Sequence, residues 1–129
     1  MKRVYPVIFT SCPESVLVYV PDFNIDTEGK DYADAIEMAR DAICITAVSI
    51  EDDGDTLPEP SAVDTVKAKK GSIVTLVDVD VEDYRQKNNM RSVRRNVTLP
   101  AYLDYAAEKS GINVSAVLQA ALKRELNLN

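Results

Sequence analysis

The chain has 129 residues, of which 46% are hydrophobic and 28% charged, a composition typical of one soluble globular domain or of two small ones. It contains no histidine, which excludes Ser-His-Asp and Cys-His catalysis and any metal site with a histidine ligand. No apolar run approaches the roughly 18 residues that a membrane span needs, and too few apolar residues follow the basic N-terminus for a signal peptide. We therefore expect a cytoplasmic protein in which Cys12 and Cys44 are reduced, although a disulfide between them is chemically possible.

The net charge of −6 conceals an asymmetry along the chain. Residues 1–83 hold 7 basic and 18 acidic side chains, a net charge of −11, whereas residues 84–129 hold 8 and 3, a net charge of +5. This division predicts two surfaces for two partners, of which only the basic one would be attracted to a polyanion. Chance variation on solvated faces is the alternative. We place a linker in the polar stretch 84–91, between an N-terminal domain at 1–83 and a C-terminal domain at 92–129.

Two short apolar runs open the N-terminal domain. Val4–Phe9 and Ser15–Val20 are rich in β-branched and aromatic residues, and the break at residues 12–14 predicts a β-hairpin. Pro6 indicates that the first strand lies at a sheet edge or carries a bulge, because proline cannot donate a hydrogen bond to a neighbouring strand.

A helix is predicted next, from Tyr32 to Ile50 with Asp31 as its N-cap. Its apolar residues recur at spacings of three and four, at Ile36, Ala39, Ile43, Ala47 and Ile50. The spacing Ser61-x-x-Asp64 is a capping box and predicts a short helix in the following stretch. A strand is predicted at residues 72–80, and its part Ile73–Val77 is nearly all apolar, so we expect it at the centre of the sheet, covered on both faces.

The C-terminal domain opens with a segment, residues 93–99, that alternates as a strand does. One face is polar and carries side chains that can hydrogen-bond base edges, namely Arg94, Asn96 and Thr98. The opposite face is largely apolar and carries Val93, Val97 and Leu99 together with Arg95.

Two helices are predicted after this strand. Pro100 is suited to the first position of one helix, Gly111 to its C-terminal cap, and Asn113 or Ser115 to the N-cap of the next. The second helix has an apolar stripe close to ideal for a core-facing helix, formed by Val114, Val117, Leu118, Ala121, Leu122 and Leu126.

A single strand cannot satisfy its own backbone donors and acceptors, and this domain contains no second strand. The economical solution is an antiparallel ribbon formed with the same strand of a second copy, with four helices covering one face. We therefore expect a homodimer or a higher even-numbered oligomer. Its expected core consists of Val97, Leu99, Leu103, Val117, Leu118 and Leu122.

Residues 92–127 resemble the ribbon-helix-helix family of transcriptional repressors, through the Arg95–Pro100 sequence, the Gly111–Ser115 turn and the stripe that ends at Leu126. The resemblance implies that Arg94, Asn96 and Thr98 read bases in the major groove of operator DNA. It also implies phosphate contacts, which we expect from Arg95 and from the start of the second helix at Asn113, Val114 and Ser115. A helical hairpin used only for dimerisation is the alternative, as is a buried role for Asn96 or Thr98.

The N-terminal domain resembles HicB antitoxins, in a set of dispersed signatures whose order carries the likeness: residues 5–9, 18–23, 27–30, 35–42 and 57–61. The resemblance implies an α+β protein whose first domain is a partial ribonuclease-H-like fold without nuclease activity. It implies a HicA-like toxin as partner, a small basic protein that cleaves mRNA, and repression of the protein's own operon. The sequence departs from the family at Asn24-Ile25, where glycine or proline is common, so that loop is expected to differ.

The acidic side chains are the candidates for toxin binding, because a surface with a net charge of −11 attracts a basic protein. The candidates are Glu28, Asp31, Asp34 and Asp41. The acidic loop at Asp52, Asp53 and Asp55 is a second possibility, or simply a solvated turn. That loop lacks the terminal glutamate spacing of a calcium site, and we expect no metal or cofactor.

Two other functions remain open. A ligand-sensing ribbon-helix-helix repressor would need a pocket with convergent polar groups, which no motif requires here. An active ribonuclease-H-like enzyme would need a cluster of carboxylates that holds a divalent metal. Asp78 and Asp80 share one face of a predicted strand, but no third carboxylate is evident. We therefore expect a protein that is not an enzyme.

Overall fold

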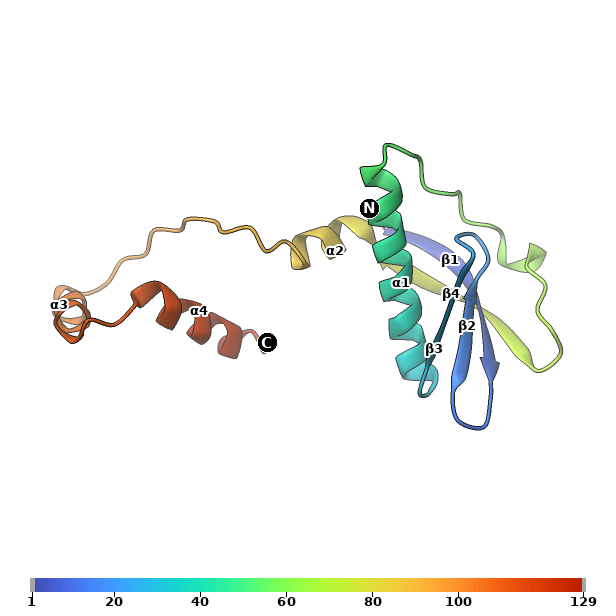
Figure 1. Ribbon diagram of the computed structural model, residues 1–129, viewed down its shortest axis with the longest axis horizontal. Coiled ribbons are helices and arrows are strands. Elements are labelled where there is room, and N and C mark those ends of the chain that lie inside the picture. Colours follow the sequence, from blue (N-terminus) through green and yellow to red (C-terminus); the bar gives the residue numbers. More distant parts are fainter. Residues whose placement is uncertain (1, 129) are drawn as a thin grey trace. The chain divides into compact units, whose positions relative to one another are not determined.

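The computed structural model describes residues 2–128 and separates into two compact units, divided after residue 90 (Figure 1). The N-terminal unit, residues 2–90, holds four strands, one long helix and two short helical segments. The C-terminal unit, residues 91–128, holds two helices. The protein is thus a mixed α+β chain.

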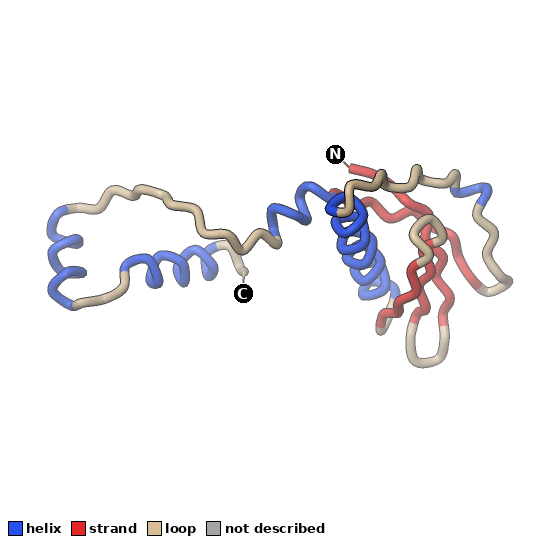
Figure 2. Tube along the Cα trace, turned by 45° about the horizontal axis from the view of Figure 1, so that its top comes forward, coloured by secondary structure: helices blue, strands red, loops and turns tan. Residues whose placement is uncertain are grey.

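An antiparallel sheet forms the body of the N-terminal unit. Its strands are β1 (Lys2–Ser11), β2 (Val16–Val20), β3 (Ile25–Gly29) and β4 (Ser72–Asp80), in the order β3-β2-β1-β4 (Figure 2). β1 and β2 form the predicted hairpin, with Phe9 opposite Val18, so that prediction is confirmed. β3 was not predicted. Its alternating sequence has few apolar residues, and it pairs along its whole length with β2.

The long helix α1 (Tyr32–Asp52) lies along one face of this sheet (Figure 1). Asp31 is its N-cap, as predicted, and its carboxylate accepts a hydrogen bond of 2.8 Å from the Asp34 backbone N–H. Between helix and sheet lies the core, built from Tyr5, Val7, Phe9, Val16, Val18, Val20, Ala35, Ala39, Ile43, Cys44, Val77 and Val79. The helix can start so close to the sheet because β3 ends at Gly29, where a Cβ would lie 2.4 Å from the Ala35 backbone nitrogen.

The predicted position of the last strand is wrong. β4 lies at the edge of the described sheet and pairs there only with β1, and Ile73 and Leu76 are 51% and 54% exposed. β1 takes the inner position instead, although it contains Pro6. The β1–β2 pairing covers only Ile8–Ser11, so Pro6 lies where β1 is paired with β4 alone and no second ladder needs its missing N–H.

The stretch between α1 and β4 is long and nearly without regular structure, but side chains fix it to the body. The Tyr5 hydroxyl donates a hydrogen bond of 2.8 Å to the Pro58 carbonyl, and the Asp22 carboxylate accepts from both the backbone N–H and the hydroxyl of Ser61. The predicted short helix is reduced to a single 3-10 turn, η1 (Val63–Thr65).

The expected linker at 84–91 is partly helical, which is a correction. The helix α2 (Val81–Lys87) continues directly from β4, Val81 is buried, and Tyr84 packs against the core. Arg85 anchors this helix to α1 through ion pairs with Asp52 at 2.9 Å and Glu51 at 3.4 Å. The sequence did not reveal α2 because two helical turns are too short for a periodic pattern.

The C-terminal unit contains the two predicted helices, α3 (Ala101–Ser110) and α4 (Val114–Glu125). Gly111 ends α3 in the left-handed region with φ of 66°, as predicted. Of the two alternatives for the N-cap of α4, the structure selects Asn113, whose side-chain oxygen accepts from the Ala116 backbone N–H at 3.0 Å.

Candidate functional site

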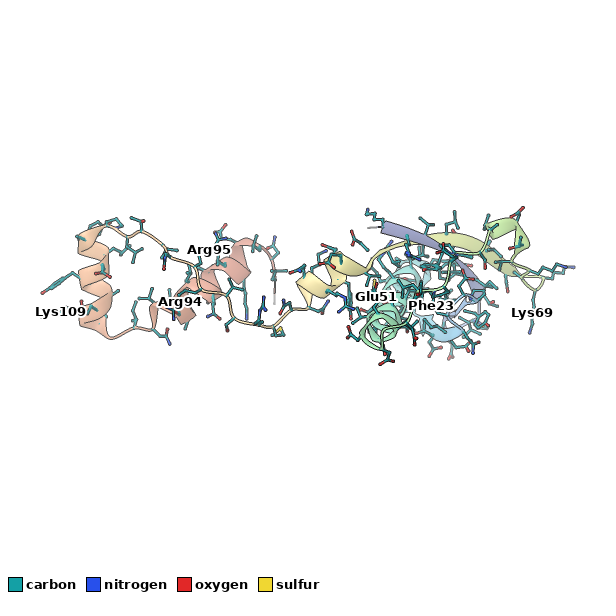
Figure 3. The ribbon with its side chains drawn as sticks, turned by 90° about the horizontal axis from the view of Figure 1, so that it is seen from above. Phe23, Glu51, Lys69, Arg94, Arg95 and Lys109 are labelled. Carbon is teal, nitrogen blue, oxygen red and sulfur yellow. The ribbon has the colours of Figure 1, made fainter. Side chains whose placement is uncertain are left out.

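The segment before α3, residues 92–100, has no regular secondary structure in the single chain. No backbone hydrogen bond joins its residues 93–99 to another element within the described part of the chain. Its side chains are exposed on both sides of the backbone, and Figure 3 shows Arg94 and Arg95 along it. The predicted strand is therefore absent from the isolated chain, and the donors and acceptors of this segment are open for pairing.

The helices of this unit form an apolar hollow of about 260 Å³. Only apolar residues line it, and they are Val97, Leu99, Leu103, Ala107, Ile112, Val114, Val117, Leu118 and Ala121. Five of the six residues predicted for the dimer core are among them. The sixth, Leu122, lies on α4 together with Val117 and Leu118 and is 49% exposed.

The C-terminal unit has no core of its own within the described chain. None of its residues from 91 to 128 is buried, and Val117 and Leu126 are 54% and 63% exposed. Besides Tyr102 and Tyr105, ten large apolar side chains from position 93 onward are at least 38% exposed. They are Val93, Val97, Leu99, Leu103, Ile112, Val114, Val117, Leu122, Leu126 and Leu128. Exposed apolar surface of this kind is typical of interaction sites in proteins.

The start of α4 carries backbone N–H groups in its first turn that have no intrahelical acceptor. Asn113 caps the helix by binding the Ala116 N–H, which leaves the N–H groups of Val114 and Ser115 in the first turn. Free N–H groups at a helix N-terminus attract phosphate. Arg95 lies on the segment before α3, and no ion pair with it is found among residues 2–128.

The four acidic candidates for toxin binding do not lie together. Glu28 is exposed on β3 and alternates with Gly29, which faces α1, so Glu28 lies on the opposite, open face of the sheet. Asp31 and Asp34 are used locally at the start of α1, where the Asp34 carboxylate also accepts from the Lys30 N–H at 2.8 Å. Asp41 is exposed on α1 and has no cation within ion-pair distance among the described residues.

A hollow of about 290 Å³, the α1–α2 hollow, lies between α1, α2 and the end of β4. Its lining is strongly charged and consists of Lys2, Glu37, Arg40, Asp41, Cys44, Asp78, Asp80, Asp83, Tyr84 and Lys87. Arg40 binds Asp78 at 2.8 Å, and this hydrogen bond with its charge lowers the pKa of Asp78 below the ordinary 3.8. Burial, reinforced by the charge of Asp41, raises the pKa values of the Cys44 thiol and of the Tyr84 hydroxyl.

The charged lining of the α1–α2 hollow is relevant to the alternative that the protein is an active ribonuclease-H-like enzyme. Asp78 is held by Arg40 at 2.8 Å and by Lys2 at 3.7 Å, a network that no sequence motif indicated. Within residues 2–128, no group of three or more histidine, cysteine or acidic side chains is arranged to hold a metal ion.

Cys12 and Cys44 are free thiols. None of the described helices is long and apolar enough to cross a membrane.

Comparison with known proteins identifies the family. The family described as "HicB_like antitoxin of bacterial toxin-antitoxin system" matches residues 5–121. A solved structure described as a toxin-antitoxin complex from Streptococcus pneumoniae has a TM-score of 0.60 at 22% identity, covering 97% of this chain and 99% of that one.

Two further solved structures have the same fold. The Burkholderia pseudomallei antitoxin HicB has a TM-score of 0.53 at 24% identity, covering 96% of each chain. A chain of the HicA3 and HicB3 toxin-antitoxin complex has a TM-score of 0.52 at 22% identity, covering 60% of this chain and 99% of that one. The comparison with curated proteins finds no match. The family match spans nearly the whole chain, and the protein therefore belongs to the HicB-like antitoxins of bacterial toxin–antitoxin systems.

Proposed function

We propose that this antitoxin neutralises a HicA-like, mRNA-cleaving toxin by binding it, and that it represses its own operon as a ribbon-helix-helix dimer. One observation carries the repressor part: the C-terminal unit has no buried residue within the described chain, and its unpaired segment at 93–99 contributes to an apolar hollow. A unit of this size cannot bury enough surface alone and needs a second copy.

A dimer would supply both the strand partner and the buried core that the single C-terminal unit lacks. Antiparallel pairing of residues 93–99 with the same residues of a second copy satisfies the open backbone groups, and the four helices cover each other's apolar sides. The polar face of the ribbon then offers two copies of Arg94, Asn96 and Thr98, and a two-stranded ribbon fits the DNA major groove. The N-termini of the two α4 helices and Arg95 would hold phosphates on either side.

The toxin partner is supported by the family and by charge. Two similar structures are described as toxin-antitoxin complexes, one of them between HicA3 and HicB3. A protein that cleaves RNA must present cations to the phosphate backbone. The first 83 residues of this chain, with their net charge of −11, would attract such a surface and speed the encounter.

Co-expression with the open reading frames that neighbour this gene tests the proposal. We expect a tagged full-length antitoxin to retain a small basic protein through purification, and the purified antitoxin to stop RNA cleavage by that protein. A complex with a dissociation constant in the nanomolar range corresponds to about −12 kcal/mol. An antitoxin that elutes alone and leaves RNA cleavage unchanged would contradict the toxin part of the proposal.

A further inference from the structure

The N-terminal unit presents two apolar surfaces that no other described part of the same unit covers. The first is the outer face of α1, opposite the buried side of the helix. Met38 and Ile45 are 39% and 51% exposed there, and their spacing of seven residues places them in one row. The second is the open face of the sheet, where Leu17 and Leu76 are 44% and 54% exposed.

The outer face of α1 is acidic as well as apolar. Asp34, Met38, Asp41 and Ile45 follow one another at spacings of four, three and four residues, so acidic and apolar side chains alternate along the row. α1 carries five acidic side chains and a single basic one, Arg40.

The one cation on this helix is already neutralised. The Arg40 guanidinium is held by Glu37 at 3.2 Å and by Asp78 at 2.8 Å. Asp41 has no such partner among the described residues, and it belongs to this row and also lines the α1–α2 hollow. The face therefore offers two apolar anchors and an exposed carboxylate that is not ion-paired within the unit.

The open face of the sheet has a mixed charge character. A hollow of about 430 Å³ on it is lined by Ile8, Leu17 and Tyr19 together with Lys67, Lys69 and Asp26. Figure 3 shows Lys69 at the turn that leads into β4. A basic partner would meet two lysines beside carboxylates on this face, whereas the single cation of α1 is ion-paired, so charge complementarity favours the α1 face.

We propose that the outer face of α1, anchored by Met38 and Ile45 with Asp41 between them, is the surface that docks the basic RNA-binding face of the toxin. This inference rests on the proposed antitoxin function and specifies its site. Exposed apolar side chains that enter pockets on a partner are common anchors of protein interfaces, and a charge that pairs across the interface adds specificity. The Asp41 carboxylate would occupy a cation that otherwise binds an RNA phosphate, so docking would also block the substrate.

Two matched double variants test the inference in the full-length antitoxin. M38K/I45K adds two positive charges to the α1 face, and L17K/L76K adds the same two charges to the sheet face at residues of similar exposure. Binding of the small basic protein that the co-expression experiment is expected to retain is measured by calorimetry. We expect M38K/I45K to weaken it about 30-fold or more, as for loss of interface hot spots, and L17K/L76K to change it by less than about 3-fold.

The outcomes separate the inference from the proposed function. If wild-type antitoxin binds no toxin, the proposed function fails. If wild type and M38K/I45K bind equally, or if only L17K/L76K loses binding, the docking surface is overturned while the function stands. Operator binding and circular dichroism of both variants check that they are folded. Should M38K/I45K not fold, Asp41→Asn on the same face decides instead: we expect association to slow about 5-fold at low salt, and an unchanged rate overturns the inference.

Discussion

Replacing Leu118 with aspartate is expected to dissociate the antitoxin into monomers and to abolish operator binding. Leu118 lines the apolar hollow of the C-terminal unit and is half-buried in the single chain. In the proposed dimer the hollow closes against a second copy, and two-fold symmetry brings two unpaired carboxylates into the apolar interface. A buried unpaired charge costs several kcal/mol, so we expect the dimer dissociation constant to rise about 1000-fold or more.

Sedimentation equilibrium over a range of concentrations measures this dissociation, and Leu118→Met is the matched control. Methionine nearly conserves the volume of leucine and carries no charge, so the dimer should remain. The N-terminal unit has its own core, formed by residues between 5 and 81, and should keep its fold in both variants. A Leu118→Asp protein that stays dimeric at wild-type concentrations would show that the hollow is not the dimer interface.

Arg94→Ala and Asn96→Ala are each expected to weaken operator binding by about 1–3 kcal/mol, because each removes contacts to base edges. Both residues lie on the unpaired segment, whose side chains are exposed in the single chain and free to contact DNA. Discrimination against operator variants should decrease at the base pairs that these side chains read. Toxin binding should be unchanged in both variants, because it is assigned to the other unit.

Arg95→Ala is the informative comparison for these two variants. We expect Arg95 to contact phosphate, so its loss should weaken operator and unrelated DNA alike and reduce the slope of log affinity against log salt by about one. Fluorescence anisotropy at several salt concentrations separates the two behaviours. Unchanged operator affinity in both Arg94→Ala and Asn96→Ala would refute their role as base readers.

The elements that local chemistry determines could be predicted from the sequence. Asp31 and Asn113 cap their helices through side-chain oxygens, and Gly111 ends α3 in a conformation that favours glycine. These features depend on a few neighbouring residues. The same holds for the hairpin of β1 and β2.

The elements that tertiary contacts determine were less predictable. Residues 73–77 are nearly all apolar, which is typical of a central strand, yet β4 lies at the sheet edge because β1 pairs on both sides. β3 is short and polar and forms only against β2. α2 stays attached to the body through Tyr84, which packs against the core, and through Arg85, whose partners lie more than 30 residues away in sequence.

The residues of one candidate site could be predicted from local sequence, whereas those of the other could not. The apolar residues predicted for the dimer core meet in one hollow, since helix periodicity places them on one side. The acidic residues predicted to bind the toxin do not lie together, because composition alone gave no information on which face of the sheet or helix each would occupy. Glu28 and Asp41 lie on opposite sides of the N-terminal unit, and Asp31 is used as a helix cap.

The pairing of residues 93–99 between two copies is the central claim, and isotope-filtered NMR on a dimer mixed from labelled and unlabelled full-length chains tests it most directly. We predict contacts between Hα protons of opposite strands that cross from one chain to the other, centred on this segment. Hα contacts of this segment confined to a single chain, or a protein that is monomeric at NMR concentrations, would contradict the claim.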